Sequence, residues 1–341
     1  MLMLRRPPFL VFVLPALGLV GSACSSSSSD GGGTEPNNPL ARAGELHGAD
    51  TWKDGTVLTG TVTIAKDGVV EIAPGAKITC AEGATLYVAG TLRAKAAASH
   101  ATITCGRWAG LVVSGGGLAD LEGVELENGL VGIATAVGAQ ESRFAEGAIR
   151  NSLKPFVVSK GSKLTVANVK ATTPEKLGPG ETSQADVEGT LVASRLDYNA
   201  HASEGISVRP GGELDLSDST IHGVNGADLV SAYSAKKVKL SYSTFTGSHC
   251  GIHIEPSESF EIDHVTSESI FGITIYGSGQ GPNIVTASNF TGSSAWLDFA
   301  GQNGAISFEN VFTSGEQILV GGPVPPTITK APALIPDAKP R

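Results

Sequence analysis

The chain has 341 residues and a formal net charge of −9, with 44 glycines, two methionines and an aromatic content of 6%. This acidic balance argues against a role in binding nucleic acid or an anionic membrane surface, because both attract basic proteins. The chain is long for one globular core, whereas a solenoid can add turns without outgrowing its core.

The first residues predict an export signal. Arg5 and Arg6 precede an apolar run over residues 9–20, which is too short for a stable membrane anchor, and small residues then lead to Cys24. This segment resembles a bacterial lipoprotein signal peptide, which implies cleavage after residue 23 and lipidation of Cys24. Gly21 departs from the family motif, which prefers Leu or another branched residue there. The alternative is an ordinary secretory signal in which Cys24 is incidental.

Residues 24–47 predict a flexible tether, because serines, glycines and prolines dominate their first part. Such a tether lets a lipid-anchored domain stand clear of the headgroups. In Gram-negative lipoproteins an Asp after the cysteine favours inner-membrane retention. Ser25 occupies that position, so the resemblance implies the outer membrane, on its surface or periplasmic face. The sequence has no second hydrophobic span, so the lipid would be the only membrane attachment.

Residues 48–113 contain four short sequence motifs. They are a tryptophan before the first strand (Trp52), an Ile-Ala-Pro-Gly turn ending at Gly75, a Leu-Tyr-Val-Ala-Gly-Thr-Leu-Arg-Ala segment ending at Ala94, and a Trp-Ala-Gly-Leu strand from Trp108. This text resembles the opening coils of right-handed parallel β-helix proteins of the pectin-lyase-like superfamily. It is most similar to the bacterial surface lipoproteins in that group. The resemblance implies an all-β, right-handed parallel β-helix solenoid of about 10–12 coils over residues 48–322.

Three residues of this region have a predicted packing role. Gly90 lies where a side chain would collide with a neighbouring coil. Trp52 and Trp108 are expected to fill the core or cap it rather than to stack on a sugar.

The remaining cysteines leave two interpretations open. Cys80 and Cys105 each end a similar strand about one coil apart, so their Cα atoms should lie about 4.8 Å apart, which a disulfide accepts. In an oxidising exported compartment they form either a disulfide or two buried thiols. Cys250 has no evident partner and is predicted to be a small buried apolar residue. No Cys-x-x-Cys or His-rich spacing suggests zinc, and no metal site is predicted.

The repeat pattern loosens between Gly115 and Gly189. Strands are expected around Val124, around Val131 and at residues 156–158. Residues 172–186 predict a long loop that either walls a binding groove or is a plain insertion.

Residues 205–320 repeat one short phrase about five times, at intervals of roughly 21 to 24 residues. Each copy predicts two strands followed by polar turn residues. Helical repeats are excluded because no copy has apolar residues at i, i+3 and i+4. A leucine-rich repeat is excluded because its Leu-x-x-Leu-x-Leu phrase is missing. Stacked copies bury a continuous core, which again favours a parallel β-helix. The apolar anchors are Ile206, Leu229, Ile252, Ile273, Leu297 and Ile318. Residues 323–341 then predict a Pro/Ala-rich extended tail that covers the open edge of the last coil.

Outward residues of successive coils should line up in columns. On the face of the first strand the candidate ligand-binding residues are Arg209, His253, Glu255, Tyr276 and Asp298. Such a row suits a saccharide-binding groove, and it equally suits an ordinary solvated sheet face. In this alignment, Val230 and Ala232 are the outward residues of the second copy.

The face of the second strand offers Asp215, Lys239, Glu261, Asp263 and Glu309. Calcium requires several oxygens that converge on one point, and Lys239 weakens that interpretation, so calcium is only a minor alternative. No other cofactor is predicted.

Two enzyme templates of the superfamily do not fit. The four polygalacturonase-like motifs are absent, so the paired carboxylates of a glycoside hydrolase are not found. Residues 261–266 echo a pectate-lyase-like phrase but have Glu261 in place of its tryptophan, and they are interpreted as ordinary repeat text. No catalytic residues are predicted.

The sequence therefore predicts a lipid-anchored cell-envelope protein with a binding or structural role toward a polysaccharide or another envelope component. One alternative is a divergent polysaccharide lyase or glycoside hydrolase. Another is a component of an adhesion or envelope complex, for which an exposed apolar patch around Val230 and Tyr233 would be the sign.

Overall fold

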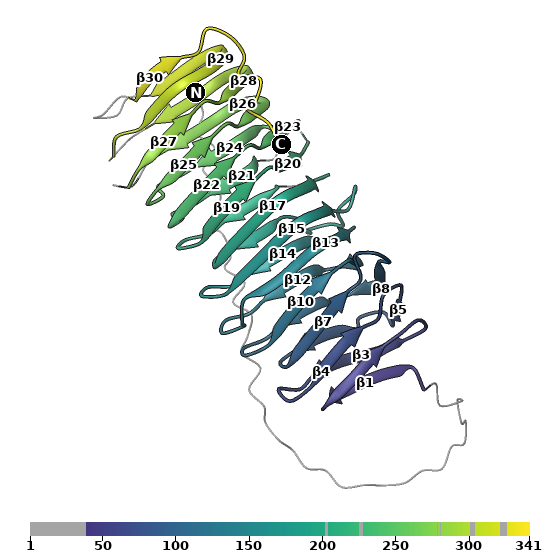
Figure 1. The fold of residues 1–341 in the computed structure, drawn as a ribbon. Coiled ribbons are helices and arrows are strands. Elements are labelled where there is room, and N and C mark those ends of the chain that lie inside the picture. The colour runs from purple at the N-terminus through teal and green to yellow at the C-terminus, as the bar shows by residue number, and fades with distance from the viewer. Residues whose placement is uncertain are drawn as a thin grey trace. The chain divides into compact units, whose positions relative to one another are not determined.

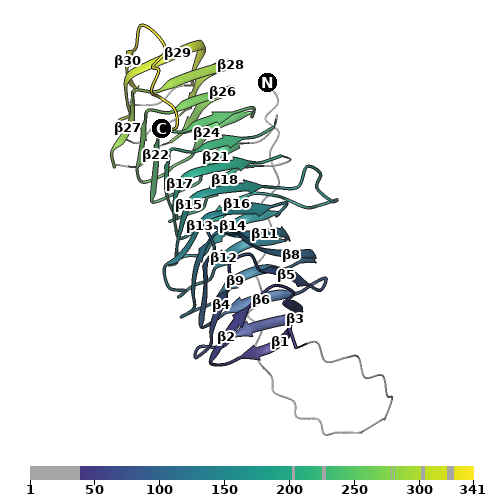
Figure 2. The same ribbon diagram turned by 45° about the vertical axis from the view of Figure 1, so that its right-hand side comes forward.

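The computed structural model of the chain is a parallel β-solenoid of about twelve turns (Figures 1 and 2). The structure describes residues 39–341 except 202–203, 225–227, 278, 280, 301–303 and 321–325, and all of its strand pairs are parallel. Within those residues no helix is long and apolar enough to cross a membrane. The predicted signal peptide, Cys24 and the first part of the predicted tether lie outside the described residues.

Each turn of the solenoid contributes strands to three faces, named here A, B and C. Face A contains β6 (Thr85–Val88), β9 (Gly110–Val113), β12 (Val131–Thr135), β14 (Lys154–Val158), β16 (Ala185–Val187), β18 (Ile206–Val208), β21 (Asp228–Ala232) and β24 (Cys250–Ile254). Face B contains β2 (Ala49–Trp52), β4 (Val69–Ile72), β7 (Thr91–Lys95), β10 (Leu118–Glu122), β19 (Glu213–Ser217), β22 (Lys237–Ser241), β25 (Phe260–Asp263), β27 (Asn283–Thr286) and β30 (Thr327–Lys330). Face C contains β5 (Lys77–Cys80), β8 (Ala101–Trp108), β11 (Val124–Gly129), β20 (Thr220–His222) and β23 (Thr244–Thr246).

Eight longer strands bend from one face to the next. They are β1 (Ala41–Leu46), β3 (Val57–Ile64), β13 (Ser142–Arg150), β15 (Lys163–Thr172), β17 (Thr190–Asn199), β26 (Thr266–Tyr276), β28 (Asn289–Ala300) and β29 (Ser307–Val320). Face A includes the C-terminal ends of β26 and β28, since Ile252 of β24 pairs with Ile273, which in turn pairs with Leu297.

The turns contain a third strand that the sequence analysis did not predict. Residues interpreted there as polar turns, such as Thr220 and Thr244, begin the short strands β20 and β23 of face C. These strands are only three residues long, so their period-two alternation is too brief to recognise in the sequence.

Inward side chains of successive turns stack in continuous apolar columns. On face A the column runs through Ile206, Val230, Ile252, Ile273 and Leu297, each of which is 0% exposed. Burying such a side chain contributes about 1.5–3 kcal/mol, so the stacked columns dominate the stability of the fold.

Two features recur at the corner between faces B and C, a backbone conformation and a hydrogen-bonded serine. From Gly123 onward, one residue at each such corner takes a left-handed φ, including Arg195, Asp218, Tyr242 and His264. A buried serine follows this residue in several turns, and its hydroxyl accepts a hydrogen bond from the backbone of the preceding turn, as Ser219 does from the N–H of Leu196 at 3.0 Å. The serine ladder satisfies backbone donors that the corner would otherwise leave unpaired.

The solenoid begins earlier than the sequence suggested. The predicted tether extended to residue 47, but β1 starts at Ala41 and pairs with β3. Within β1, Arg42 forms an ion pair with Asp50, and its Nε lies 2.6 Å from Oδ2 of the aspartate.

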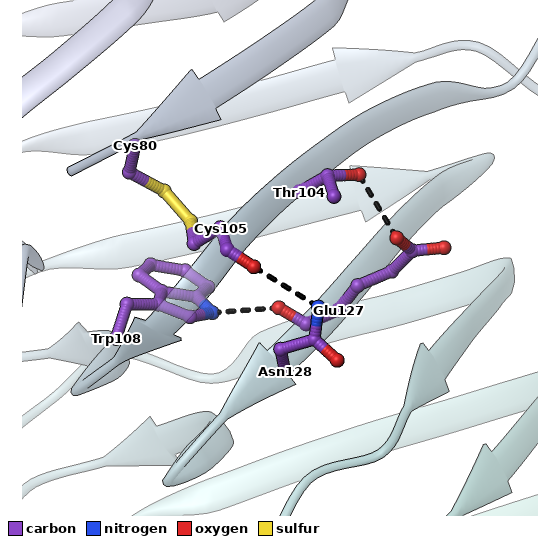
Figure 3. Close-up of a disulfide and its surroundings, with 6 residues drawn as sticks. All are labelled: Cys80, Thr104, Cys105, Trp108, Glu127 and Asn128. Atoms are coloured by element: carbon purple, nitrogen blue, oxygen red, sulfur yellow. Dashed lines mark hydrogen bonds between the residues drawn. A yellow bond between two sulfur atoms is a disulfide. The ribbon is translucent and has the colours of Figure 1, made fainter. Parts of the chain in front are cut away.

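Cys80 and Cys105 are direct register partners on face C, with Cα atoms 4.7 Å apart, and their sulfur atoms form a disulfide (Figure 3). The adjoining Trp108 is 1% exposed and donates from Nε1 to the carbonyl of Glu127 at 2.9 Å. Trp52 is likewise fully buried. Both tryptophans therefore pack in the core.

Residues 173–184 form the loop expected at 172–186, between β15 and β16. Its Glu181 forms an ion pair with Arg107 of β8, and Ser183 donates to the carbonyl of Leu153 at 2.8 Å. The loop is therefore held against earlier turns of the solenoid.

The C-terminal segment adds one strand at the edge and then returns along the solenoid. β30 pairs with β29 on face B. Beyond it, the backbone N–H of Ile335 donates to Asn289 at 3.0 Å. At the end of the chain, Arg341 bonds to Asp218 at 3.1 Å, and its guanidinium lies 3.7 Å from the centre of the Tyr242 ring.

Candidate functional site

The outward residues of face A form two parallel columns along the strands β16, β18, β21, β24, β26 and β28. The first column is Asp186, Ser207, Ser231, His253, Thr274 and Asp298, which are successive register partners. The second lies two residues further along each strand and includes Arg209, Tyr233, Glu255 and Tyr276.

The predicted alignment of the second copy was wrong by one residue. Val230, not Leu229, is the partner of Ile206, so Val230 and Ala232 point inward and are fully buried. Ser231 and Tyr233 take the outward positions. Val230 is buried and therefore contributes nothing to the exposed apolar patch with Tyr233 that would be the sign of an adhesion component.

His253 is the centre of the site. Its Nδ1 lies 2.8 Å from Oδ2 of Asp228, and its Nε2 lies 3.8 Å from Oε1 of Glu255. The side chain is only 15% exposed, and Nε2 is buried without a hydrogen-bond partner. The aspartate fixes the orientation of the ring through Nδ1, so Nε2 is the ring nitrogen without a hydrogen-bond partner.

Tyr276 and Asp298 form the C-terminal part of the site. The Tyr276 hydroxyl donates to the carboxylate of Asp298, and the ring packs edge-on against His253 with centroids 5.5 Å apart. Burial and the hydrogen bond to Asp298 both raise the pKa of Tyr276, so its hydroxyl stays protonated and donates at neutral pH. The ring is 38% exposed, which leaves an aromatic surface open to a ligand.

Arg209 does not join this group. Its guanidinium binds Asp186 at 2.9 Å, and Lys154 binds the same carboxylate at 2.6 Å. Burial raises the pKa of Asp186, but its hydrogen bond to Lys154 and the charges of Lys154 and Arg209 outweigh this effect and lower it. This ion-pair network ties together three turns of face A and occupies Arg209.

Cys250 and Asp228 belong to the site although the sequence analysis did not place them there. Cys250 is 4% exposed, and its Sγ lies 3.4 Å from the hydroxyl of Thr274. Burial, then the negative charge of Asp228, raise the pKa of the thiol to about 12, so it is neutral in the protein alone. Asp228 and Cys250 are register partners at the start of their strands, and three-dimensional stacking alone brings them to His253.

The acidic residues predicted on face B are mostly paired with neighbours. Asp215 lies 4.0 Å from Lys239, Glu261 lies 3.9 Å from Lys237, and Asp263 accepts from Thr286 at 2.6 Å. Glu309 instead accepts from Ser307 at 2.7 Å. Within the described ranges, these carboxylates form no cluster that could hold calcium, and the one cluster of metal-binding groups lies on face A.

Comparison with known proteins adds no family assignment. No family model, no curated protein and no solved structure matches the chain significantly.

Proposed function

We propose that the protein is a lipid-anchored component of a bacterial cell envelope that binds a saccharide on face A. The observation that carries this proposal is the half-exposed ring of Tyr276 beside the polar groups of His253, Glu255 and Asp298. Saccharides are recognised by aromatic rings that cover their apolar faces and by a few fixed polar groups that orient their hydroxyls.

The negative charge of the site favours some classes of saccharide over others. Asp228 and Glu255 flank the imidazole of His253, and Asp298 lies two strands further on beside Tyr276. The nearest arginine of the columns, Arg209, is occupied by Asp186. An acidic polysaccharide would be repelled from this surface, since like charges brought together are costly. A neutral polysaccharide or one that carries amino groups fits better.

The envelope location rests on the N-terminal sequence. The basic and apolar signal segment, Cys24 and the Ser/Gly-rich tether resemble those of bacterial lipoproteins, and the opening coils resemble the pectin-lyase-like superfamily. The proposed place is the outer membrane, with the lipid on Cys24 as the attachment.

A polysaccharide lyase or hydrolase is the second candidate, and the Asp228–His253 pair is the observation in its favour, since a carboxylate often orients a catalytic imidazole. The free Nε2 is buried, however, so it could not reach a proton of a substrate without a rearrangement. A binding role is therefore the better supported proposal.

The test is a glycan array probed with the full chain carrying Cys24→Ser, which removes the proposed lipid attachment. We expect selective binding to neutral or amino-bearing glycans, at least tenfold weaker in Tyr276→Ala. Tyr87→Ala, which removes an exposed aromatic ring from an early turn of face A, is the matched control and should bind normally. Binding that Tyr276→Ala leaves unchanged would contradict the proposed site, and release of unsaturated or shortened products would favour the enzyme.

A further inference from the structure

Three side chains of different metal-binding types converge on face A. One oxygen of Asp228, the sulfur of Cys250 and a ring nitrogen of His253 all lie within 4.8 Å of one another. A tetrahedral zinc ion at ordinary bond lengths holds its donor atoms roughly 3.3–3.7 Å apart, so only small side-chain movements are needed. The three residues come from two adjacent strands, β21 and β24, whose backbones the sheet holds rigidly.

We propose that Asp228, Cys250 and His253 form a zinc-binding site. Thiolate, imidazole and carboxylate are the ligands that zinc takes, whereas calcium and magnesium prefer oxygen alone. Three protein ligands leave a fourth position for water or a ligand group, as in zinc sites that act on or bind small molecules. The site does not depend on saccharide binding.

The groups around the three ligands suit this assignment. Histidine ligands usually donate their second ring N–H to a carboxylate, and Nε2 of His253, buried and unpartnered, lies 3.8 Å from Glu255. The hydroxyl of Thr274, 3.4 Å from the sulfur, can donate a hydrogen bond to a thiolate. Both outer groups therefore become better satisfied when a metal is bound.

Zinc binding must release a proton here. The ion displaces the S–H proton of Cys250 into solvent, and His253 binds it through Nδ1, the nitrogen that faces Asp228, with the ring proton on Nε2. For the thiol, the balance is one zinc ion bound and one proton released.

The experiment is titration of zinc, and of cobalt as a spectroscopic probe, into the oxidised full chain carrying Cys24→Ser. With Cys80 and Cys105 in the disulfide, Cys250 is then the single free thiol. We expect one ion per chain, a thiolate-to-cobalt charge-transfer band and release of one proton. Cys250→Ser should abolish the band and weaken zinc binding by more than about 100-fold, since loss of an outer partner alone costs 10–100-fold.

Two further variants keep the result interpretable. Glu255→Gln alters an outer partner and leaves the three proposed ligands intact, and it should weaken zinc binding about 10–100-fold. His100→Asn is the matched control, because His100 also pairs with a carboxylate, Glu125 at 3.2 Å, but has no thiol nearby. The zinc affinity of this variant should equal that of the parent chain. The proposal would be overturned if the parent chain bound zinc no more tightly than Cys250→Ser does. A cobalt complex of the parent chain without the thiolate band would also overturn it. Glycan binding measured without metal tests the saccharide proposal separately.

Discussion

At the scale of single residues, the close stacking of turns makes some glycines irreplaceable. A Cβ on Gly90 would lie 2.1 Å from the carbonyl oxygen of Ala65 and 2.3 Å from that of Gly68, both of them backbone atoms of the preceding turn. Backbone atoms cannot move aside as a flexible side chain can. This agrees with the sequence-based prediction that a side chain at Gly90 would collide with a neighbouring coil.

We therefore expect Gly90→Ala to lower the free energy of unfolding by about 1–3 kcal/mol, the usual cost of overpacking. Gly60→Ala is the matched control, because a Cβ there has no atom within 4 Å and should be neutral or stabilising by up to about 1 kcal/mol. Chemical denaturation of the two variants measures the difference. Equal midpoints would show that the turns can separate locally at little cost.

At the scale of strands, the period of the repeat was enough to predict the fold but not every register. Leu229 and Val230 are both apolar and both buried, so the sequence could not tell which of them continues the column of Ile206. A slip of one residue exchanges the two faces of a strand, which is why Val230 was assigned outward.

The candidate site was found only in part for a related reason. His253, Glu255, Tyr276 and Asp298 lie in regular outward positions and could be predicted. Asp228 and Cys250 lie where the chain enters face A, before regular alternation begins, so only the stacked structure shows that they reach His253.

The disulfide gives a prediction at the same scale. Cys80 and Cys105 are 25 residues apart and link β5 to β8, so the bond restricts the unfolded chain across one full turn. Reduction should lower the free energy of unfolding by about 3 kcal/mol. The measurement is denaturation with and without reductant, and the double variant Cys80→Ala/Cys105→Ala is the control, in which reductant should change nothing. No effect of reductant on the parent chain would mean that the two sulfurs are not bonded in solution.

At the scale of the whole solenoid, the last turn would offer unpaired backbone groups to another chain. β30 occupies part of that edge by pairing Ser307 with Thr327 and Phe308 with Ile328. The residues beyond β30 then fasten the segment to earlier turns through Asn289 and Asp218. An uncovered parallel edge of this kind is a template for edge-to-edge association.

Ending the chain after residue 326 should therefore promote self-association, because it removes β30 and exposes the hydrogen-bonding edge of β29. Ending it after residue 336 is the matched control, since β30 and its pairing remain. This ending removes the ion pairs of Asp337 and Arg341 and the buried Ala338, whose carbonyl accepts a hydrogen bond from Thr266. The two ion pairs should contribute at most about 1 kcal/mol, and the hydrogen bond to Ala338 about 0.5–1.5 kcal/mol, whereas the edge of β29 stays covered. Sedimentation velocity over a range of concentrations distinguishes the two chains: the shorter one should form larger species as its concentration rises, and the longer one should behave like the intact protein. If both sediment alike, the edge of β29 does not depend on β30 for its protection, and the C-terminal segment serves only to stabilise the turns that it crosses.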